Sequence, residues 1–228
     1  KVKPQRASDH VFIQGVPMVD QGYKGYCVVA STERVLRYYG TDVDANELAQ
    51  IADTSSFGGT SLDGMRAAMR KLTTRLKIPF REIERMEVRD VLAIIKDYNR
   101  AAKKAGEREV GDPGFILDLG FIFSRMKPNL LKETRLAKAT EMERFFREIQ
   151  LHVEQGIPLL WSVQLGILRE GNIPQDAGGH MRLVIGYNGK TKEVIFSDSW
   201  GAGHERKRMP LEDAWTITTG LMKIEPQS

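Results

Sequence analysis

The pattern of apolar residues changes at Gly156, and this change constrains the fold more than any other feature of the sequence. Before Gly156, apolar residues recur at helical spacing in four segments, residues 26–39, 44–53, 60–72 and 141–155. After it come short runs with the length and composition of β-strands, residues 158–164, 182–187, 193–196 and 217–225. Asn188-Gly189 indicates a hairpin between two of these runs, because both residues tolerate positive φ. Helices followed by antiparallel strands predict an α+β fold in which a helical lobe faces a sheet lobe.

The chain is long enough, at 228 residues, to bury a substantial core. We expect one domain over residues 1–228, with the helical lobe at about 20–155 and the sheet lobe at about 157–226. Residues 88–140 are helical in pattern but interrupted by glycine and proline, which indicates a helical insertion. Residues 78–83 are expected to form a strand, and residues 1–10 a polar tail.

The composition excludes several classes of protein. Apolar residues make up 41% and charged residues 28%, as in an ordinary globular chain and unlike a disordered one. The net charge of +4 comes from 34 basic and 30 acidic side chains, so it favours acidic partners only mildly. No basic run with interleaved aromatic residues indicates nucleic-acid binding. No apolar stretch reaches the about 20 residues of a membrane span.

Two features of the sequence bear on the cellular location of the protein: its cysteine count and its first residue. One cysteine is present, so no internal disulfide can form. The sequence opens at Lys1 rather than at Met, which predicts that an upstream segment has been removed. This favours a secreted, periplasmic or membrane-associated protein, and we expect a monomer.

Cys27 lies where a glycine-containing loop, residues 21–26, gives way to a helix. The partial positive charge at a helix start stabilises a thiolate, which is the nucleophilic form of cysteine. Gly22 and Gly25 allow backbone amides to approach a substrate carbonyl closely, as an oxyanion site requires. Gln21 offers a side-chain amide to the same site. The alternative is an unreactive cysteine buried in a helical core.

His180 is the best candidate for the base that activates this thiol. It follows Ala177-Gly178-Gly179 and opens the β-like run 183–187, so a rigid strand would hold the imidazole near the thiol. The other three histidines lie in less favourable contexts. His10 lies in the polar tail, His152 in the interior of an amphipathic helix and His204 in a charged loop.

Asp198 is the candidate for the group that orients the imidazole. It follows the strand-like run 193–196, and the expected hairpin would bring it beside His180. Trp200 would cover the hydrogen bond between them, although a tryptophan is also an ordinary core residue. The alternative role for Asp198 is to cap the backbone amides of a turn. Lys24 and Arg182 flank the site and are expected to be solvated charges or, alternatively, to favour acidic substrates.

These residues, taken in chain order, resemble the papain superfamily of cysteine peptidases. That family has a glutamine six residues before the nucleophilic cysteine and an Asn-Ser-Trp-Gly motif after the histidine strand, where this chain has Asp198-Ser199-Trp200-Gly201. Within the superfamily the chain is most similar to the double-glycine (bacteriocin-processing) peptidase-like group. The motifs that carry this similarity are Val16-Pro17-Met18-Val19-Asp20-Gln21, Gly59-Thr60-Ser61-Leu62, Gln155-Gly156-Ile157-Pro158, Gly179-His180 and Ile185-Gly186-Tyr187-Asn188.

The resemblance implies a papain-like fold, with the nucleophile on a central helix, and a hydrolase that forms a thioester acyl-enzyme. Cys27 would attack a peptide or amide carbonyl, Gln21 would stabilise the oxyanion, and His180 with Asp198 would transfer protons. A peptide or protein substrate is implied, with no metal and no organic cofactor. The residues expected to contact the substrate are Gly25, Tyr26, Gly179 and Trp200.

Two departures from the family limit the analogy. Papain has a Gly-Ser-Cys-Trp sequence around its nucleophile, which Tyr26-Cys27-Val28 lacks, and Asp198 replaces an asparagine. The chain also lacks the phosphate loop of the exporters to which double-glycine peptidases are joined. Three alternatives therefore stay open: a papain-fold amidase or transglutaminase-like acyl transferase, a catalytically silent binding module, and a structural domain in which Cys27 and His180 are unrelated.

Overall fold

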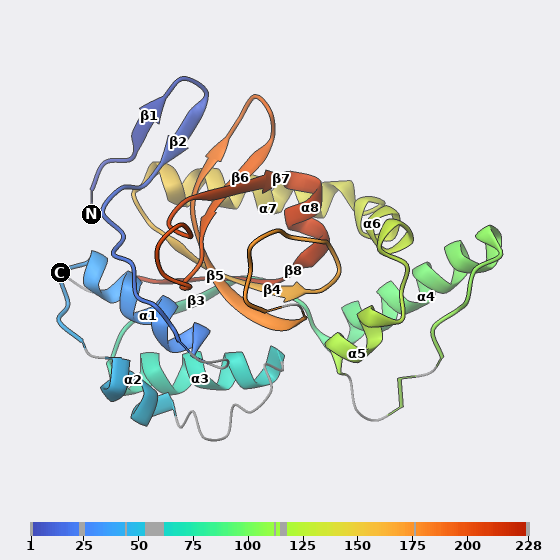
Figure 1. Cartoon of the computed structure of the whole chain (residues 1–228), viewed down its shortest axis with the longest axis horizontal. Coiled ribbons are helices and arrows are strands. Elements are labelled where there is room, and N and C mark those ends of the chain that lie inside the picture. The colour runs from blue at the N-terminus through green and yellow to red at the C-terminus, as the bar shows by residue number, and fades with distance from the viewer. Residues whose placement is uncertain are drawn as a thin grey trace.

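The computed structural model describes residues 2–22, 26–43, 45–52, 62–111, 113–114, 118–175 and 177–226. Within them, eight strands form one antiparallel sheet (Figure 1). The strand order is β1-β2-β5-β4-β8-β3, and β6 pairs with β5 and with β7. The strands are β1 (Gln5–Ala7), β2 (His10–Phe12), β3 (Phe80–Arg85), β4 (Leu159–Leu165), β5 (Gly178–Asn188), β6 (Glu193–Ser197), β7 (Lys207–Pro210) and β8 (Thr218–Ile224).

Helices cover the sheet in two groups, each with its own hydrophobic core. The helices are α1 (Cys27–Tyr38), α2 (Ala45–Ala52), α3 (Leu62–Arg75), α4 (Val88–Ala105), α5 (Leu119–Ser124), α6 (Pro128–Leu136), α7 (Ala139–Glu154) and α8 (Leu211–Ile217). One core joins α1, α2 and α3 to Leu183 and Ile185 of β5. The other joins α4 to α8 to Val184, which lies between Leu183 and Ile185 on the same strand. Because side chains alternate along a strand, the two helix groups lie on opposite faces of the sheet (Figure 1).

The predicted α+β fold with an antiparallel sheet is confirmed, and the expected helices and strands are found with small shifts of their ends. The start of the helix expected at residue 60 lies outside the described residues, as does the motif residue Gly59. The described part of residues 88–140 contains the helices α4, α5 and α6, as expected, and Tyr98 of α4 accepts a hydrogen bond from the backbone of Lys127 just before α6, at 2.8 Å. No described helix is both long enough and apolar enough to cross a membrane.

The N-terminal segment departs from the prediction. Residues 1–10 were expected to form a polar tail, yet β1 and β2 lie within residues 5–12 and join the sheet. Val11 and Phe12 are buried, so this hairpin is held by packing that its short polar sequence does not reveal. Strands β1, β2 and β3 thus add N-terminal residues to a sheet that was expected from the C-terminal third alone.

The hairpin between β5 and β6 is confirmed, but its turn differs from the expected one. Four residues, 189–192, connect the strands, and the positive φ belongs to Lys192 at 50°. Asn188 contributes through its side chain, whose Oδ1 accepts the N–H groups of Lys190 at 2.9 Å and Thr191 at 3.0 Å. An asparagine that bonds to the next backbone amides stabilises a turn without itself adopting positive φ.

Gly186 lies where β2 passes close to β5, and a side chain at this position has a predictable cost. A Cβ at this position would lie 2.5 Å from the carbonyl oxygen of Val11 and 2.7 Å from Cβ of Phe12. Gly186→Ala is therefore expected to lower the free energy of unfolding by about 1–3 kcal/mol through overpacking, measured by urea denaturation. Gly189→Ala is the control, because its Cβ would meet Tyr187 at an ordinary 3.6 Å. Equal stability of the two variants would show that β2 does not pack on β5 as described.

Candidate active site

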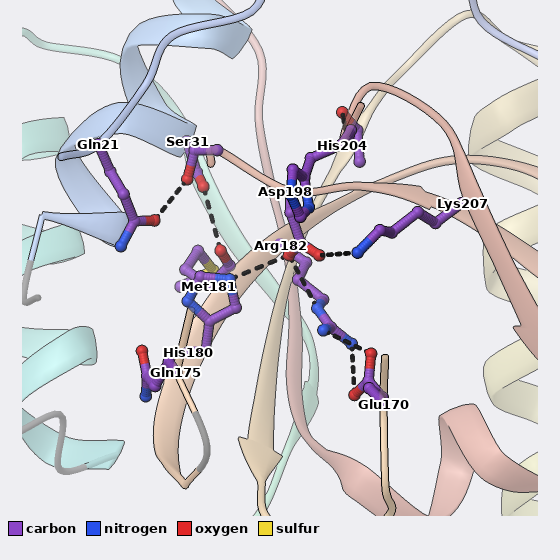
Figure 2. Close-up of polar contacts among 12 residues, drawn as sticks. Gln21, Ser31, Glu170, Gln175, His180, Met181, Arg182, Asp198, His204 and Lys207 are labelled. Atoms are coloured by element: carbon purple, nitrogen blue, oxygen red, sulfur yellow. Dashed lines mark hydrogen bonds and ion pairs between the residues drawn. The ribbon is translucent and has the colours of Figure 1, made fainter. Parts of the chain in front are cut away.

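Cys27 is the first residue of α1 and is 1% exposed. Tyr26 is the N-cap, and its side chain makes no capping hydrogen bond to the helix start. Two contacts fix α1 against the sheet. The hydroxyl of Ser31 donates to the carbonyl of Met181 on β5 at 3.3 Å (Figure 2). Arg34 donates to the hydroxyl of Ser197 at the end of β6 at 2.5 Å. α1 is therefore anchored beside β5, which carries His180, and beside the end of β6, which Asp198 directly follows.

His180 is completely buried on β5, and each part of its ring has a defined neighbour. Its Nε2 lies 3.0 Å from Oδ1 of Asp198 (Figure 2). The ring of Trp200 stacks on the imidazole with centroids 4.3 Å apart and planes 5° from parallel. His204 contacts the other ring of this stack, edge-on to Trp200 at 5.7 Å. Trp200 thus shields the histidine–aspartate contact from water.

The remaining imidazole nitrogen is available to the thiol. Nδ1 of His180 is buried and has no hydrogen bond of normal geometry to any described residue. Burial alone would lower the pKa of His180, but the hydrogen bond to Asp198 and the interaction with Cys27 outweigh it and raise the pKa above its ordinary value. The thiol therefore lies close enough to His180 to interact with it, without a fully formed hydrogen bond. This arrangement favours the protonated form of the imidazole.

Asp198 is the most heavily contacted charge of the site. Its Oδ1 accepts hydrogen bonds from His180 and, at 2.9 Å, from Nε of Arg182. The ammonium group of Lys207 lies 4.0 Å from Oδ2. Burial would raise the pKa of Asp198, but the hydrogen bond from His180 and the charge of Arg182 outweigh it and lower the pKa. Asp198 is therefore held as a carboxylate, although it is fully buried.

Arg182 was expected to be a solvated charge, and that expectation is wrong. Its side chain is completely buried, and besides Asp198 it binds both carboxylate oxygens of Glu170, at 3.1 and 2.7 Å (Figure 2). Its guanidinium also lies over the ring of Phe196, 4.6 Å from the centroid. The sequence carried one signal for this contact: residue 182 follows residue 180 by two on a strand, so both side chains point to the same face.

Gln21 is oriented by Ser199, a residue whose role no pattern in the sequence indicated. The hydroxyl of Ser199 donates to the side-chain oxygen of Gln21 at 2.7 Å, and the N–H of Gln21 donates to the carbonyl of Ser199 at 2.7 Å. Because the oxygen of the Gln21 side chain is engaged, its NH₂ group is the part left to donate to a substrate. The structure thus brings together Gln21, Cys27, His180 and Asp198.

The four residues expected to contact substrate differ in their positions. Gly25 and the flanking Lys24 lie outside the described residues. Tyr26 is 38% exposed beside Cys27. Gly179 is buried within β5, and its carbonyl accepts a hydrogen bond from Gln175 at 3.2 Å. Trp200 contacts His180 directly. Contact with substrate stays a prediction for all four.

The remaining histidines have structural surroundings. His10 is part of β2, where its Nε2 lies 3.2 Å from the side-chain amide of Asn188. His152 contacts the carbonyl of Glu148 within α7 at 2.8 Å. In the part of the chain that the structure describes, no group of three or more His, Cys, Asp or Glu side chains could hold a metal ion.

The raised pKa of His180 generates a prediction about pH. Asp198 stabilises the protonated imidazole, so the contribution of this pair to stability is complete below the ordinary histidine pKa and is lost as pH rises through the raised value. Asp198→Asn removes the negative charge that raises the pKa of His180, while the burial that lowers it is unchanged. The pKa of His180 is therefore expected to fall below its ordinary value. Titration of ring-labelled histidine by NMR measures this change. Asp97→Asn on α4 is the control, and an unchanged pKa in Asp198→Asn would contradict the pairing.

Comparison with known proteins agrees with the resemblance in one segment. Residues 119–222 match the model of the Peptidase_C39 like family. The matched segment contains His180 and Asp198, and it includes the expected helical insertion from residue 119 onward, whereas Gln21 and Cys27 lie before it. No curated protein sequence matches the chain.

Two solved structures are similar to the chain at low identity. The peptidase domain of Streptococcus ComA, a bi-functional ABC transporter involved in a quorum sensing pathway, is 14% identical with a TM-score of 0.44, over 93% of this chain and 100% of that one. Xylellain, a cysteine protease from Xylella fastidiosa, is 11% identical with a TM-score of 0.47, over 100% of this chain and 91% of that one. Similarity at this level carries no argument about function. The family match over residues 119–222 confirms the resemblance of the chain to the double-glycine peptidase-like group.

Proposed function

We propose that the chain is a cysteine hydrolase that cleaves a peptide or amide bond through a thioester at Cys27. One observation carries the proposal: the buried hydrogen bond from His180 to Asp198 leaves the second imidazole nitrogen for the only thiol of the chain. A nucleophile, a base within reach of it and a third group that orients the base are the parts that covalent acyl transfer requires. The match to a peptidase family supports a cysteine hydrolase in general.

The proposed reaction begins with the proton of Cys27 on His180. The thiolate attacks the substrate carbonyl, and the oxyanion that forms accepts hydrogen bonds from the backbone N–H of Cys27 and the side-chain NH₂ of Gln21. His180 then donates its proton to the leaving amine, and a thioester remains on Cys27. Water attacks the thioester, His180 takes up the proton from that water, and release of the carboxylic acid restores the pair.

Asp198 has a specific part in this scheme. A carboxylate favours the imidazolium more strongly than the neutral asparagine of papain would, because its charge opposes that of the protonated ring. Arg182 binds the same carboxylate oxygen at 2.9 Å and would draw charge from it, but Glu170 compensates the charge of Arg182. Asp198 therefore keeps enough negative charge to orient His180 in the protonation state that precedes attack.

Burial of the site favours a second candidate function. Cys27 is 1% exposed and His180 is fully buried, so a substrate reaches the thiol only after the side chains around it move. A catalytically silent binding module would keep the same contacts and need no such movement. An amidase or a transglutaminase-like acyl transferase would use the same first step and differ in the group that accepts the acyl chain.

Alkylation of Cys27 separates an active site from a silent one. Because this is the only cysteine, incorporation of iodoacetamide reports on it alone. We expect alkylation well below about pH 8, where a free thiol reacts slowly. His180→Ala is expected to slow the reaction at least about tenfold, because it removes the base that activates the thiol.

The matched control is His10→Ala, which removes a histidine far along the sheet from Cys27 and should leave the rate unchanged. Slow alkylation with the pH profile of a free thiol, equal in both variants, would exclude the hydrolase and leave the silent module. Incubation of the unmodified chain with a diverse peptide mixture, against Cys27→Ala, then tests cleavage itself.

A further inference from the structure

A concave site that Cys27 does not line lies between the hairpin β1–β2 and the strands β6 and β7. Its volume is about 520 Å³, within the about 300–1,000 Å³ of typical ligand pockets. The described residues that line it are Gln5, Ala7, His10, Phe12, Ile195, Arg206, Lys207 and Arg208. None of them belongs to the proposed catalytic group.

The pocket is basic and its described lining holds no carboxylate. Arg206 and Arg208 are exposed, and neither forms an ion pair with a described acidic residue. Arg206 instead lies over the ring of Phe12, 4.7 Å from the centroid, and Arg208 donates to Nε2 of His10 at 3.2 Å. The carboxylate of the neighbouring Glu205 accepts the N–H of Gly203 at 2.9 Å. Of the three cations that line the pocket, Lys207 lies near Asp198, and the charges of Arg206 and Arg208 are left to attract an anionic ligand.

The floor of the pocket is apolar, because it is formed by the side chains of Phe12 and Ile195. These side chains are 7% and 4% exposed. Gly186 lies opposite Phe12 in the sheet, and its lack of a side chain lets the hairpin pack close to β5. A ligand that fits has an apolar group for the floor and negative charges for the arginines at the rim. Simple inorganic anions lack the first of these features.

Two of the strands that line the pocket, β1 and β7, are edge strands, which favours a peptide over other anions. Among the described residues, β1 pairs only with β2, and β7 pairs only with β6 (Figure 1). Each strand therefore keeps N–H and C=O groups along one side that no described strand satisfies. An extended peptide can bind such an edge by main-chain hydrogen bonds while its side chains enter the adjoining pocket.

We propose that this pocket binds an acidic peptide segment that carries an apolar side chain. The acidic residues pair with Arg206 and Arg208, and the apolar side chain packs on Phe12 and Ile195. Lys207 links the pocket to the candidate active site, because its ammonium group also lies 4.0 Å from Oδ2 of Asp198. Binding here requires no cleavage, so the proposal stands or falls separately from the hydrolase.

The experiment measures binding of a fluorescein-labelled octapeptide, in which two phenylalanines are spaced among glutamates, by fluorescence anisotropy. The protein is the full chain with Cys27→Ala, which prevents cleavage of the probe. The double variant Arg206→Glu and Arg208→Glu is expected to weaken binding at least about tenfold, because two charge-assisted contacts become repulsive. The milder Arg206→Gln and Arg208→Gln pair is measured as well, and circular dichroism verifies that each variant is folded.

The matched control reverses two exposed lysines of α4, Lys103→Glu and Lys104→Glu, and is expected to leave binding unchanged. An octapeptide with lysine in place of glutamate should not bind. The proposal is overturned if the acidic probe does not bind the unmodified pocket, or if the pocket and control variants lose affinity equally. It is also overturned if inorganic phosphate or a single-stranded oligonucleotide of equal charge displaces the probe at the same concentration as unlabelled peptide.

Discussion

The buried carboxylate of Asp198 is the interaction on which the rest of the site depends. A carboxylate removed from water costs several kcal/mol unless opposite charges and hydrogen bonds compensate it. Here it is compensated by His180 at 3.0 Å, Arg182 at 2.9 Å and Lys207 at 4.0 Å. Each of these partners comes from a different position in the sheet, so the requirement to satisfy one charge fixes the relation of β5, β6 and β7.

The residues next to Asp198 extend this control to the thiol. Ser199 holds Gln21 through one backbone and one side-chain hydrogen bond, and Trp200 covers the imidazole. Ser197, on the other side of Asp198, accepts a hydrogen bond from Arg34 of α1. Four consecutive residues therefore position the base, the amide donor and the helix that begins at Cys27. A site assembled in this way is rigid because its parts share one short segment of backbone.

Much of this site could be predicted from the sequence because its parts carry local signals. A cysteine after a glycine-containing loop at a helix start, a histidine at the start of a strand and an aspartate at the end of the next strand each fit a known geometry. The proximity of Gln21, Cys27, His180 and Asp198 followed from these signals together, although their catalytic roles remain proposals. The helices and the longer strands followed from periodicity.

The parts that were missed depend on tertiary contacts. Arg182 looked like a solvated charge because its second partner, Glu170, comes from the connection between β4 and β5, whose course no local pattern predicts. Strands β1 and β2 have three residues each, and the hairpin they form is stabilised by the pairing of β2 with β5 rather than by its own composition. The basic pocket follows from that hairpin, so it could not be predicted from the sequence either.

The most direct test of the central claim is crosslinking of the thiol to the imidazole with 1,3-dibromoacetone, a short reagent that alkylates two adjacent nucleophiles. After proteolysis, mass spectrometry should find one crosslink, between Cys27 and His180, and none in His180→Ala. A crosslink from Cys27 to any other residue, or a thiol that carries the reagent on one arm alone, would contradict the contact from which the site is built.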